Sequence, residues 1–177
     1  MTTADISRPE SSEYAPFYHT YVSVVPDGDV VSILRESGRE IVSAIRAVPE
    51  SRGGFRYGDD KWTVREVVGH LIDAERIFSY RALRIARGDE TPLASFDENA
   101  YVRTAGSDAR TLASLVAELA AVRESTVTLF ESLPREAWTR VGTASGKSVS
   151  VRAVAYIVAG HAMHHLRILR EKYQIAG

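Results

Sequence analysis

The chain has 177 residues, of which 45% are hydrophobic, so it can bury one core and is expected to form a single domain spanning residues 1–177. Its 22 Lys and Arg nearly balance its 23 Asp and Glu, and a net charge of −1 predicts neither a nucleic-acid nor a membrane partner. There is no cysteine, which excludes disulfides, thiolate metal ligands and a cysteine nucleophile. Any metal chemistry therefore depends on His, Asp and Glu.

The start of the chain predicts neither a signal peptide nor a membrane anchor. Residues 1–5 are polar and are not followed by the basic and apolar segments of a signal peptide. No apolar run approaches the eighteen or so residues that a membrane helix needs. We therefore expect a soluble, cytoplasmic protein.

Residues 1–27 are expected to form an irregular N-terminal arm that packs on the body, because they contain three prolines and several aromatic residues. His19 is alone in this arm and is expected to be an ordinary surface histidine. From about residue 28 to residue 48, apolar residues recur with helical spacing and predict the first helix.

The second helix has the clearest predicted start. Thr63 and Glu66 fit a capping box, and the apolar period continues until Gly88. His70 therefore lies about two turns into this helix. Residues 88–106 are expected to form a long connection that crosses the bundle and covers one end of it.

A third helix is predicted from about residue 108 to residue 132. The polar stretch 142–148 is expected to be a loop, and the three residues between its glycines do not fit a phosphate-binding loop. Ser148 or Ser150 can cap a final helix that runs to about Lys172. The four helices and their long crossover connection predict an all-α four-helix bundle.

Three histidines form the most informative pattern in the sequence. His161 and His165 lie one turn apart on one helix face, where two imidazoles can bind one metal ion, and His70 would be the third ligand. Three neutral imidazoles leave an open position, as in a catalytic metal site. The alternatives are packed or surface histidines, and the site requires the second and last helices to be neighbours. His164 could also replace His165 as the ligand.

A general base is harder to assign from the sequence. Asp73 and Glu66 lie on roughly the same helix face as His70, so either could orient a ligand or accept a proton as a catalytic residue. The alternative is a solvated charge or, for Glu66, the capping box alone. Asp97 and Glu98 in the connection could also reach the site. The absence of HExxH and of Glu-x-x-His motifs argues against a metalloprotease of that kind and a di-iron carboxylate bundle.

Three segments resemble the DinB/YfiT-like superfamily, and its YfiT-like branch in particular: residues 62–71, 96–101 and 160–166. They follow in the right order between about residues 60 and 170. The resemblance implies a four-helix bundle that holds a divalent ion, commonly zinc or nickel, by one histidine of the second helix and the HxxxH pair of the last. Carried over residue by residue, the metal ligands are His70, His161 and His165.

The resemblance also implies an enzyme that acts on a small-molecule substrate, commonly as a homodimer. Members are described as metal-dependent hydrolases, and relatives include transferases and isomerases that use bacillithiol, mycothiol or glutathione. We expect transfer of such a low-molecular-weight thiol to an electrophilic small molecule, with the metal favouring the thiolate. The alternatives are hydrolysis by metal-bound water and a non-catalytic, stress-associated protein that binds a metal or ligand.

Overall fold

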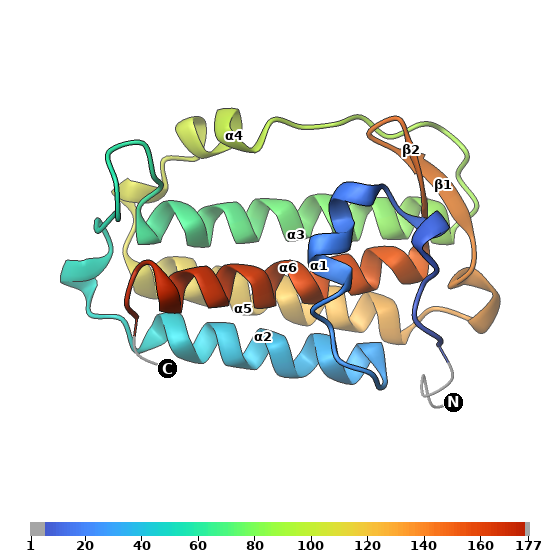
Figure 1. Cartoon of the computed structure of the whole chain (residues 1–177), viewed down its shortest axis with the longest axis horizontal. Coiled ribbons are helices and arrows are strands. Elements are labelled where there is room, and N and C mark those ends of the chain that lie inside the picture. The colour runs from blue at the N-terminus through green and yellow to red at the C-terminus, as the bar shows by residue number, and fades with distance from the viewer. Residues whose placement is uncertain (1–5, 176–177) are drawn as a thin grey trace.

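Four long helices pack side by side in the computed structural model, which describes residues 6–175 (Figure 1). They are α2 (Val30–Arg46), α3 (Val64–Ala86), α5 (Leu112–Glu131) and α6 (Val151–Glu171). Both α2 and α3 pack against α5 and α6. The predicted all-α four-helix bundle is confirmed, and no described helix is long and apolar enough to cross a membrane.

Side chains cap the start of each long helix. Asp29 accepts hydrogen bonds from two backbone amides of α2, and Thr111 accepts one from the first turn of α5. Thr63 and Glu66 form the predicted capping box of α3. Of the two serines proposed to cap α6, Ser150 does so. Each cap satisfies amide donors that have no partner within the helix, which fixes where the helix begins.

The connection after α3 contains a helix that the sequence interpretation missed. This segment carries α4 (Glu98–Ala105) and η5 (Ser107–Ala109), and α4 packs on α3. Asp97 caps α4 by accepting hydrogen bonds from the Asn99 and Ala100 amides. As Figure 1 shows, the connection returns along the length of α3, so that α5 runs in the same direction as α3.

The stretch predicted to be a loop at residues 142–148 is instead part of a β-hairpin. Strand β1 (Val141–Ala144) pairs in antiparallel fashion with β2 (Lys147–Ser150). Ser145 and Gly146 form the turn with φ values of 55° and 71°, which match the left-handed turn that closes two-residue hairpins. Leu93, in the crossover connection between α3 and α5, forms a parallel bridge with Ala144. This bridge attaches the crossover to the hairpin.

The N-terminal arm contains short helical turns and lies against α6 (Figure 1). These turns are η2 (Ser11–Glu13), η3 (Pro16–Tyr18) and α1 (His19–Val22), while residues 1–5 of the expected arm lie outside the described part of the chain. The Glu13 carboxylate accepts hydrogen bonds from Arg152 Nε at 2.8 Å and from Ser150 Oγ at 2.6 Å. Burial alone would raise the pKa of Glu13, but these hydrogen bonds outweigh it and lower the pKa to about 2. The arm is thereby attached to the start of α6.

A polar layer separates two hydrophobic clusters inside the bundle. One cluster lies toward the hairpin and contains Trp138 and Val149, and the other lies toward the opposite end. At the boundary between the two clusters, three of the helices carry a buried polar residue. These residues are Ser37 on α2, Arg123 on α5 and His161 on α6. The layer therefore places polar side chains in the middle of an apolar interior.

A bidentate ion pair forms the centre of this layer. Arg123 Nε and Nη2 donate to the two carboxylate oxygens of Glu75 on α3 at 2.7 and 2.8 Å. Arg123 Nη1 donates to the Leu34 carbonyl at 2.9 Å and to Ser37 Oγ at 3.2 Å, both on α2. The Arg123 and Glu75 side chains are only 7% and 5% exposed. One guanidinium therefore joins three helices through charge-assisted hydrogen bonds.

We predict that Arg123→Ala lowers the free energy of unfolding by about 3–5 kcal/mol, because it leaves the buried Glu75 carboxylate without its partner. Urea denaturation followed by circular dichroism measures this change. The matched control is Arg170→Ala, which removes an ion pair with Glu40 whose side chains are 40% and 52% exposed. Its cost should stay below about 1 kcal/mol. Equal losses in the two variants would contradict the role given to the buried pair.

Candidate metal centre

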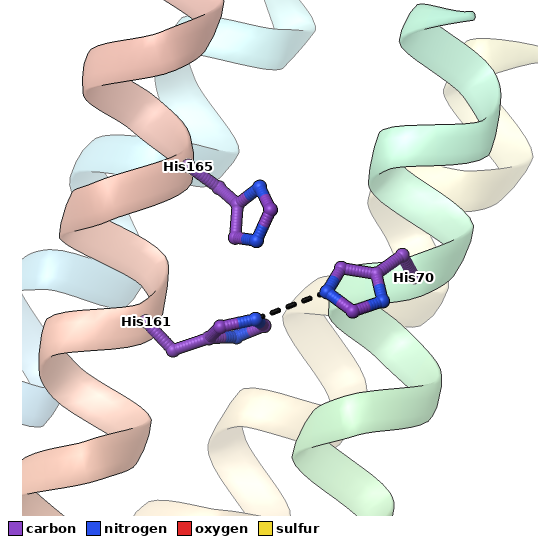
Figure 2. Close-up of side chains that lie close together, drawn as sticks. All are labelled: His70, His161 and His165. Carbon is purple, nitrogen blue, oxygen red and sulfur yellow. Dashed lines mark hydrogen bonds between the residues drawn. The ribbon is translucent and has the colours of Figure 1, made fainter. Parts of the chain in front are cut away.

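Helices α3 and α6 bring three imidazoles together in the polar layer (Figure 2). His70 of α3 faces His161 and His165 of α6, and each offers a ring nitrogen that lies within 4.8 Å of the other two. The Nε2 atoms of His70 and His161 are 3.0 Å apart. The structure thus makes α3 and α6 neighbours, as the predicted site required, and groups the three histidines proposed as ligands.

The three imidazoles differ in their exposure. His70 and His161 are 6% and 5% exposed, whereas His165, one turn further along α6, is half-buried. The four-residue spacing places both α6 imidazoles on the helix face that meets α3. The group therefore has a buried side, formed by His70 and His161, and a more open side at His165.

All three imidazoles are held in their neutral form. Burial lowers the pKa of His70 to about 4. Burial is the main cause that lowers the pKa of His161 and of His165 well below the usual value, and repulsion from the neighbouring histidines adds to it. A neutral imidazole keeps a lone pair on one ring nitrogen, and this is the form that binds metal ions.

The donor set fits one divalent ion. Two nitrogen ligands of a tetrahedral zinc ion lie about 2.0–2.1 Å from the metal and therefore about 3.3 Å from each other. The 3.0 Å between the His70 and His161 nitrogens is close to this separation, and a His165 nitrogen lies within 4.8 Å of both. Three imidazoles without thiolates or carboxylates suit zinc, nickel and other borderline ions.

His164 and His19 lie outside this group. The His164 ring packs edge-on against Tyr21 and His165, at centroid distances of 5.3 and 5.4 Å. Its Nδ1 is buried and has no hydrogen-bond partner in the described part of the chain. His165, and not His164, therefore shares the α3-facing side of α6 with His161. His19 is exposed, with its Nδ1 3.3 Å from the Tyr14 hydroxyl.

The two acids considered as catalytic residues are not part of the group. Glu66 Oε2 accepts a hydrogen bond from the Thr63 amide at 2.7 Å, as the capping-box alternative predicted. Asp73 is half-buried, and burial raises its pKa. Its charged neighbours are Arg76 and Glu118, not the histidines. A role for Glu66 or Asp73 as a base or orienting group stays a proposal.

Aromatic rings that the sequence interpretation did not connect with the site surround the imidazoles. The ring centroid of Trp62 lies 4.8 Å from that of His70. The ring centroids of Tyr21 and Phe78 lie 5.2 and 5.7 Å from that of His161. Phe78 follows His70 by eight residues, two turns along the same helix face, so its spacing contained a usable signal. Tyr21 comes from the arm, and no local pattern could have placed it here.

The Tyr21 hydroxyl remains protonated at neutral pH. Burial, together with the negative charge of Glu98, raises the pKa of Tyr21 to about 12. Glu98 is the first residue of α4. The expectation that Glu98 could reach the site stays a prediction.

Glycines beside two of the histidines let other segments approach the ligand helices closely. A Cβ atom at Gly160 would lie 2.0 Å from the backbone oxygen of Tyr21, and one at Gly69 would lie 2.1 Å from Ser107 Oγ. The arm thus rests directly on α6 beside His161, and the crossover rests on α3 beside His70. Both covering segments are positioned at the level of the site.

Fold and site together define a helical bundle that carries a candidate metal centre between two of its long helices. Residues 33–169 match the family model of the DinB superfamily, and the chain therefore belongs to this superfamily. The resemblance stated from the sequence is confirmed.

One curated protein is similar to this chain in sequence. The sequence is 30% identical over 102 residues to "Putative metal-dependent hydrolase YfiT" of Bacillus subtilis strain 168, covering 57% of this chain and 55% of that protein. The chain thus matches about half the length of this curated relative.

Two solved structures share the fold. The structure of YfiT from Bacillus subtilis, described as a probable metal-dependent hydrolase with an unusual four-helix bundle topology, aligns with a TM-score of 0.74 at 19% identity over 98% of each chain. A mycothiol-dependent maleylpyruvate isomerase aligns with a TM-score of 0.66 at 14% identity, over 77% of this chain and 57% of the other. At these identities, the matches establish the fold.

We predict that Gly160→Ala releases the arm from α6, because the new methyl group meets a backbone oxygen that cannot rotate away. Faster proteolytic cleavage and hydrogen exchange in residues 15–25 would measure the release. Gly69→Ala is the matched control, since its methyl group meets the Ser107 side chain, which can change rotamer. In a helix interior, glycine to alanine otherwise stabilises by about 1 kcal/mol. An arm that stays protected in Gly160→Ala would show that this contact does not position it.

Proposed function

We propose that the protein is a metal-dependent enzyme that acts on a small molecule. In this proposal, one divalent ion, zinc or nickel, is held by His70, His161 and His165. The observation that carries the proposal is the convergence of three neutral imidazoles, two of them buried, whose ring nitrogens all lie within 4.8 Å of one another. The name of YfiT, as a metal-dependent hydrolase, supports it. The open side at His165 supports access for a substrate.

We predict about one equivalent of a divalent metal per chain in protein purified without a histidine tag, measured by elemental analysis. His161→Ala and His165→Ala should each lower metal affinity by at least about tenfold, because each removes one of three ligands. The matched control is His164→Ala, which removes the neighbouring imidazole outside the group and should retain the metal.

Wild-type protein without stoichiometric metal would overturn the proposal. Equal losses in His164→Ala and His165→Ala would overturn the ligand assignment.

The proposed reaction is the transfer of a low-molecular-weight thiol to an electrophilic small molecule. A bound divalent ion would supply an open coordination position that favours the thiolate form of such a thiol near neutral pH. Because the chain has no cysteine, the nucleophile must come from a cosubstrate such as bacillithiol, mycothiol or glutathione. The thiol proton passes to solvent, the sulfur forms a bond to the electrophilic carbon, and the leaving group departs with the bonding electrons.

The surroundings of the site favour a thiol over water as the nucleophile. In the part of the chain that the structure describes, the three imidazoles contact one another, His164 and aromatic rings, and no carboxylate hydrogen-bonds to them. A thiol, with a pKa near 8.5, loses its proton without a strong base, whereas water needs more assistance. The thiol dependence in the isomerase's name agrees with this proposal, although that enzyme shares only the fold.

Hydrolysis is the second candidate function, and the name of YfiT is the observation that favours it. In this reaction the nucleophile would be water, and its proton would need an acceptor. Asp73 and Glu66 are the acids proposed for this role. In the structure Glu66 accepts a hydrogen bond from the Thr63 amide, and the charged neighbours of Asp73 are Arg76 and Glu118.

We predict that the metal-loaded protein accelerates the conjugation of monochlorobimane to at least one of the three thiols by more than about tenfold over the uncatalysed rate. Fluorescence of the conjugate measures the rate, and His161→Ala should abolish the acceleration. No acceleration with any of the thiols would contradict thiol transfer. Turnover of ester substrates without a thiol would support hydrolysis in its place.

The proposed assembly and location are a homodimer in the cytoplasm, without a nucleic-acid or membrane partner. The net charge of −1 supports the absence of these partners, since it attracts neither polyanions nor anionic lipid. Size-exclusion chromatography with light scattering tests the dimer.

A further inference from the structure

Arg81 of α3 is a buried cation to which the described chain supplies no counter-charge. In residues 6–175, the buried Asp, Glu, Lys and Arg residues are Glu75, Arg81 and Arg123. Glu75 and Arg123 pair with each other, whereas Arg81, only 3% exposed, forms no ion pair with a described residue. Burying a charge without a partner is strongly unfavourable. The charge of Arg81 therefore needs compensation from another source.

The groups that contact Arg81 are neutral. Its Nη2 donates hydrogen bonds to the Ala94 carbonyl at 2.7 Å and to Ser145 Oγ at 2.9 Å. Its guanidinium carbon lies 5.8 Å from the centroid of the Phe96 ring. These contacts attach α3 to the crossover and to the turn of the hairpin, but none of them cancels the charge. Both hydrogen bonds come from Nη2, so Nε and Nη1 have no acceptor in the described part of the chain.

A small pocket adjoins Arg81 where α3 and α6 meet the hairpin and the arm. The buried side chains of Phe78, Val154 and Ile157 form an apolar side of this pocket. The free space inside it has room for about one water-sized group. It therefore suits a single small ion or the end of a larger molecule. This space is called the Arg81 pocket below.

The charged residues that line the Arg81 pocket are both cations. They are Arg81 and Lys147, and no carboxylate belongs to the lining. Lys147 is exposed on β2 beside Ser148, whose hydroxyl can donate a hydrogen bond at the outer side of the pocket. A guanidinium among apolar side chains attracts an anion more strongly than one in water, because the local dielectric is lower. A water molecule carries no charge and would leave that of Arg81 uncompensated.

We propose that the Arg81 pocket binds a small monovalent anion, which supplies the counter-charge of Arg81. A chloride ion and the carboxylate end of a small acid present this same chemistry, namely one negative charge on atoms that accept hydrogen bonds. The small free space disfavours a tetrahedral dianion such as sulfate. Phe78 lines the pocket and packs against His161, so the anion site is a neighbour of the candidate metal centre. The inference does not depend on the proposed function.

The test follows the Nε–H resonance of Arg81 by NMR in protein kept in sodium gluconate, whose anion is too large for the pocket. Sodium chloride and sodium formate are titrated in separate arms at constant ionic strength. Wild-type protein should show a saturable shift of this resonance with at least one of them, and the anion that saturates at the lower concentration identifies the source. Sodium sulfate should give no saturable shift.

Arg81→Met tests whether the guanidinium holds the anion, because it removes the charge and keeps an unbranched side chain. The backbone amide resonances of Lys147 and Ser148 report binding in this variant, and its affinity should fall by more than about tenfold. The matched control is Arg87→Met, the same change at an exposed arginine just after α3, which should leave the affinity unchanged. Equal affinities in Arg81→Met and Arg87→Met would overturn the proposal.

Wild-type protein tests the proposal even where Arg81→Met does not fold. An anion that binds the folded chain stabilises it, so the bound anion should raise the urea midpoint above that in gluconate at equal ionic strength. Arg87→Met should show the same rise. The absence of a saturable shift of the Arg81 resonance with both chloride and formate would overturn the anion site. So would a urea midpoint that is the same in chloride, formate and gluconate.

Discussion

The ion pair between Arg123 and Glu75 is the interaction on which the interior of the bundle depends. Burying a charge costs several kcal/mol, and only near-ideal hydrogen bonding recovers that cost. Arg123 achieves this by bonding to α3 and α2 from its place on α5, so these three helices must keep one register. Glu75 follows His70 by five residues on α3, and the register that pairs Glu75 also sets the level at which His70 meets α6. The polar layer thus links the packing of the helices to the position of the site.

The sequence predicted the long helices because their starts carry local signals. The Thr63 and Glu66 capping box and the glycine after α3 are readable without tertiary structure. Helix α4 was missed because it has only eight residues and one buried side chain, Val102, which is too little for a periodic pattern. The hairpin was missed because its two four-residue strands are rich in Gly, Ser and Thr and resemble a loop in composition.

The candidate site was predictable in part. The spacing of His161 and His165 is local and was readable, but the approach of His70 depends on which helices are neighbours, and single-helix patterns do not contain that information. His70 was therefore proposed as the third ligand on the condition that the second and last helices are neighbours, and the family resemblance supported that proposal. Tyr21 was out of reach because its contact with His161 joins an arm and a helix that are far apart in the sequence. Gly160 leaves room for the Tyr21 backbone, but a glycine alone does not show which segment approaches it.

The contact between the His70 and His161 nitrogens also affects the chain as a polymer. These residues are 91 positions apart, and whatever bridges their nitrogens, a proton or a cation, closes a loop of that length. Cross-links across long loops remove the most freedom from the unfolded chain, and secreted proteins commonly obtain this effect from disulfides. A chain without cysteine has no such bond available. A reversible link between α3 and α6 would let the protein gain or lose this constraint with the supply of the ion, so that its resistance to unfolding would follow metal availability.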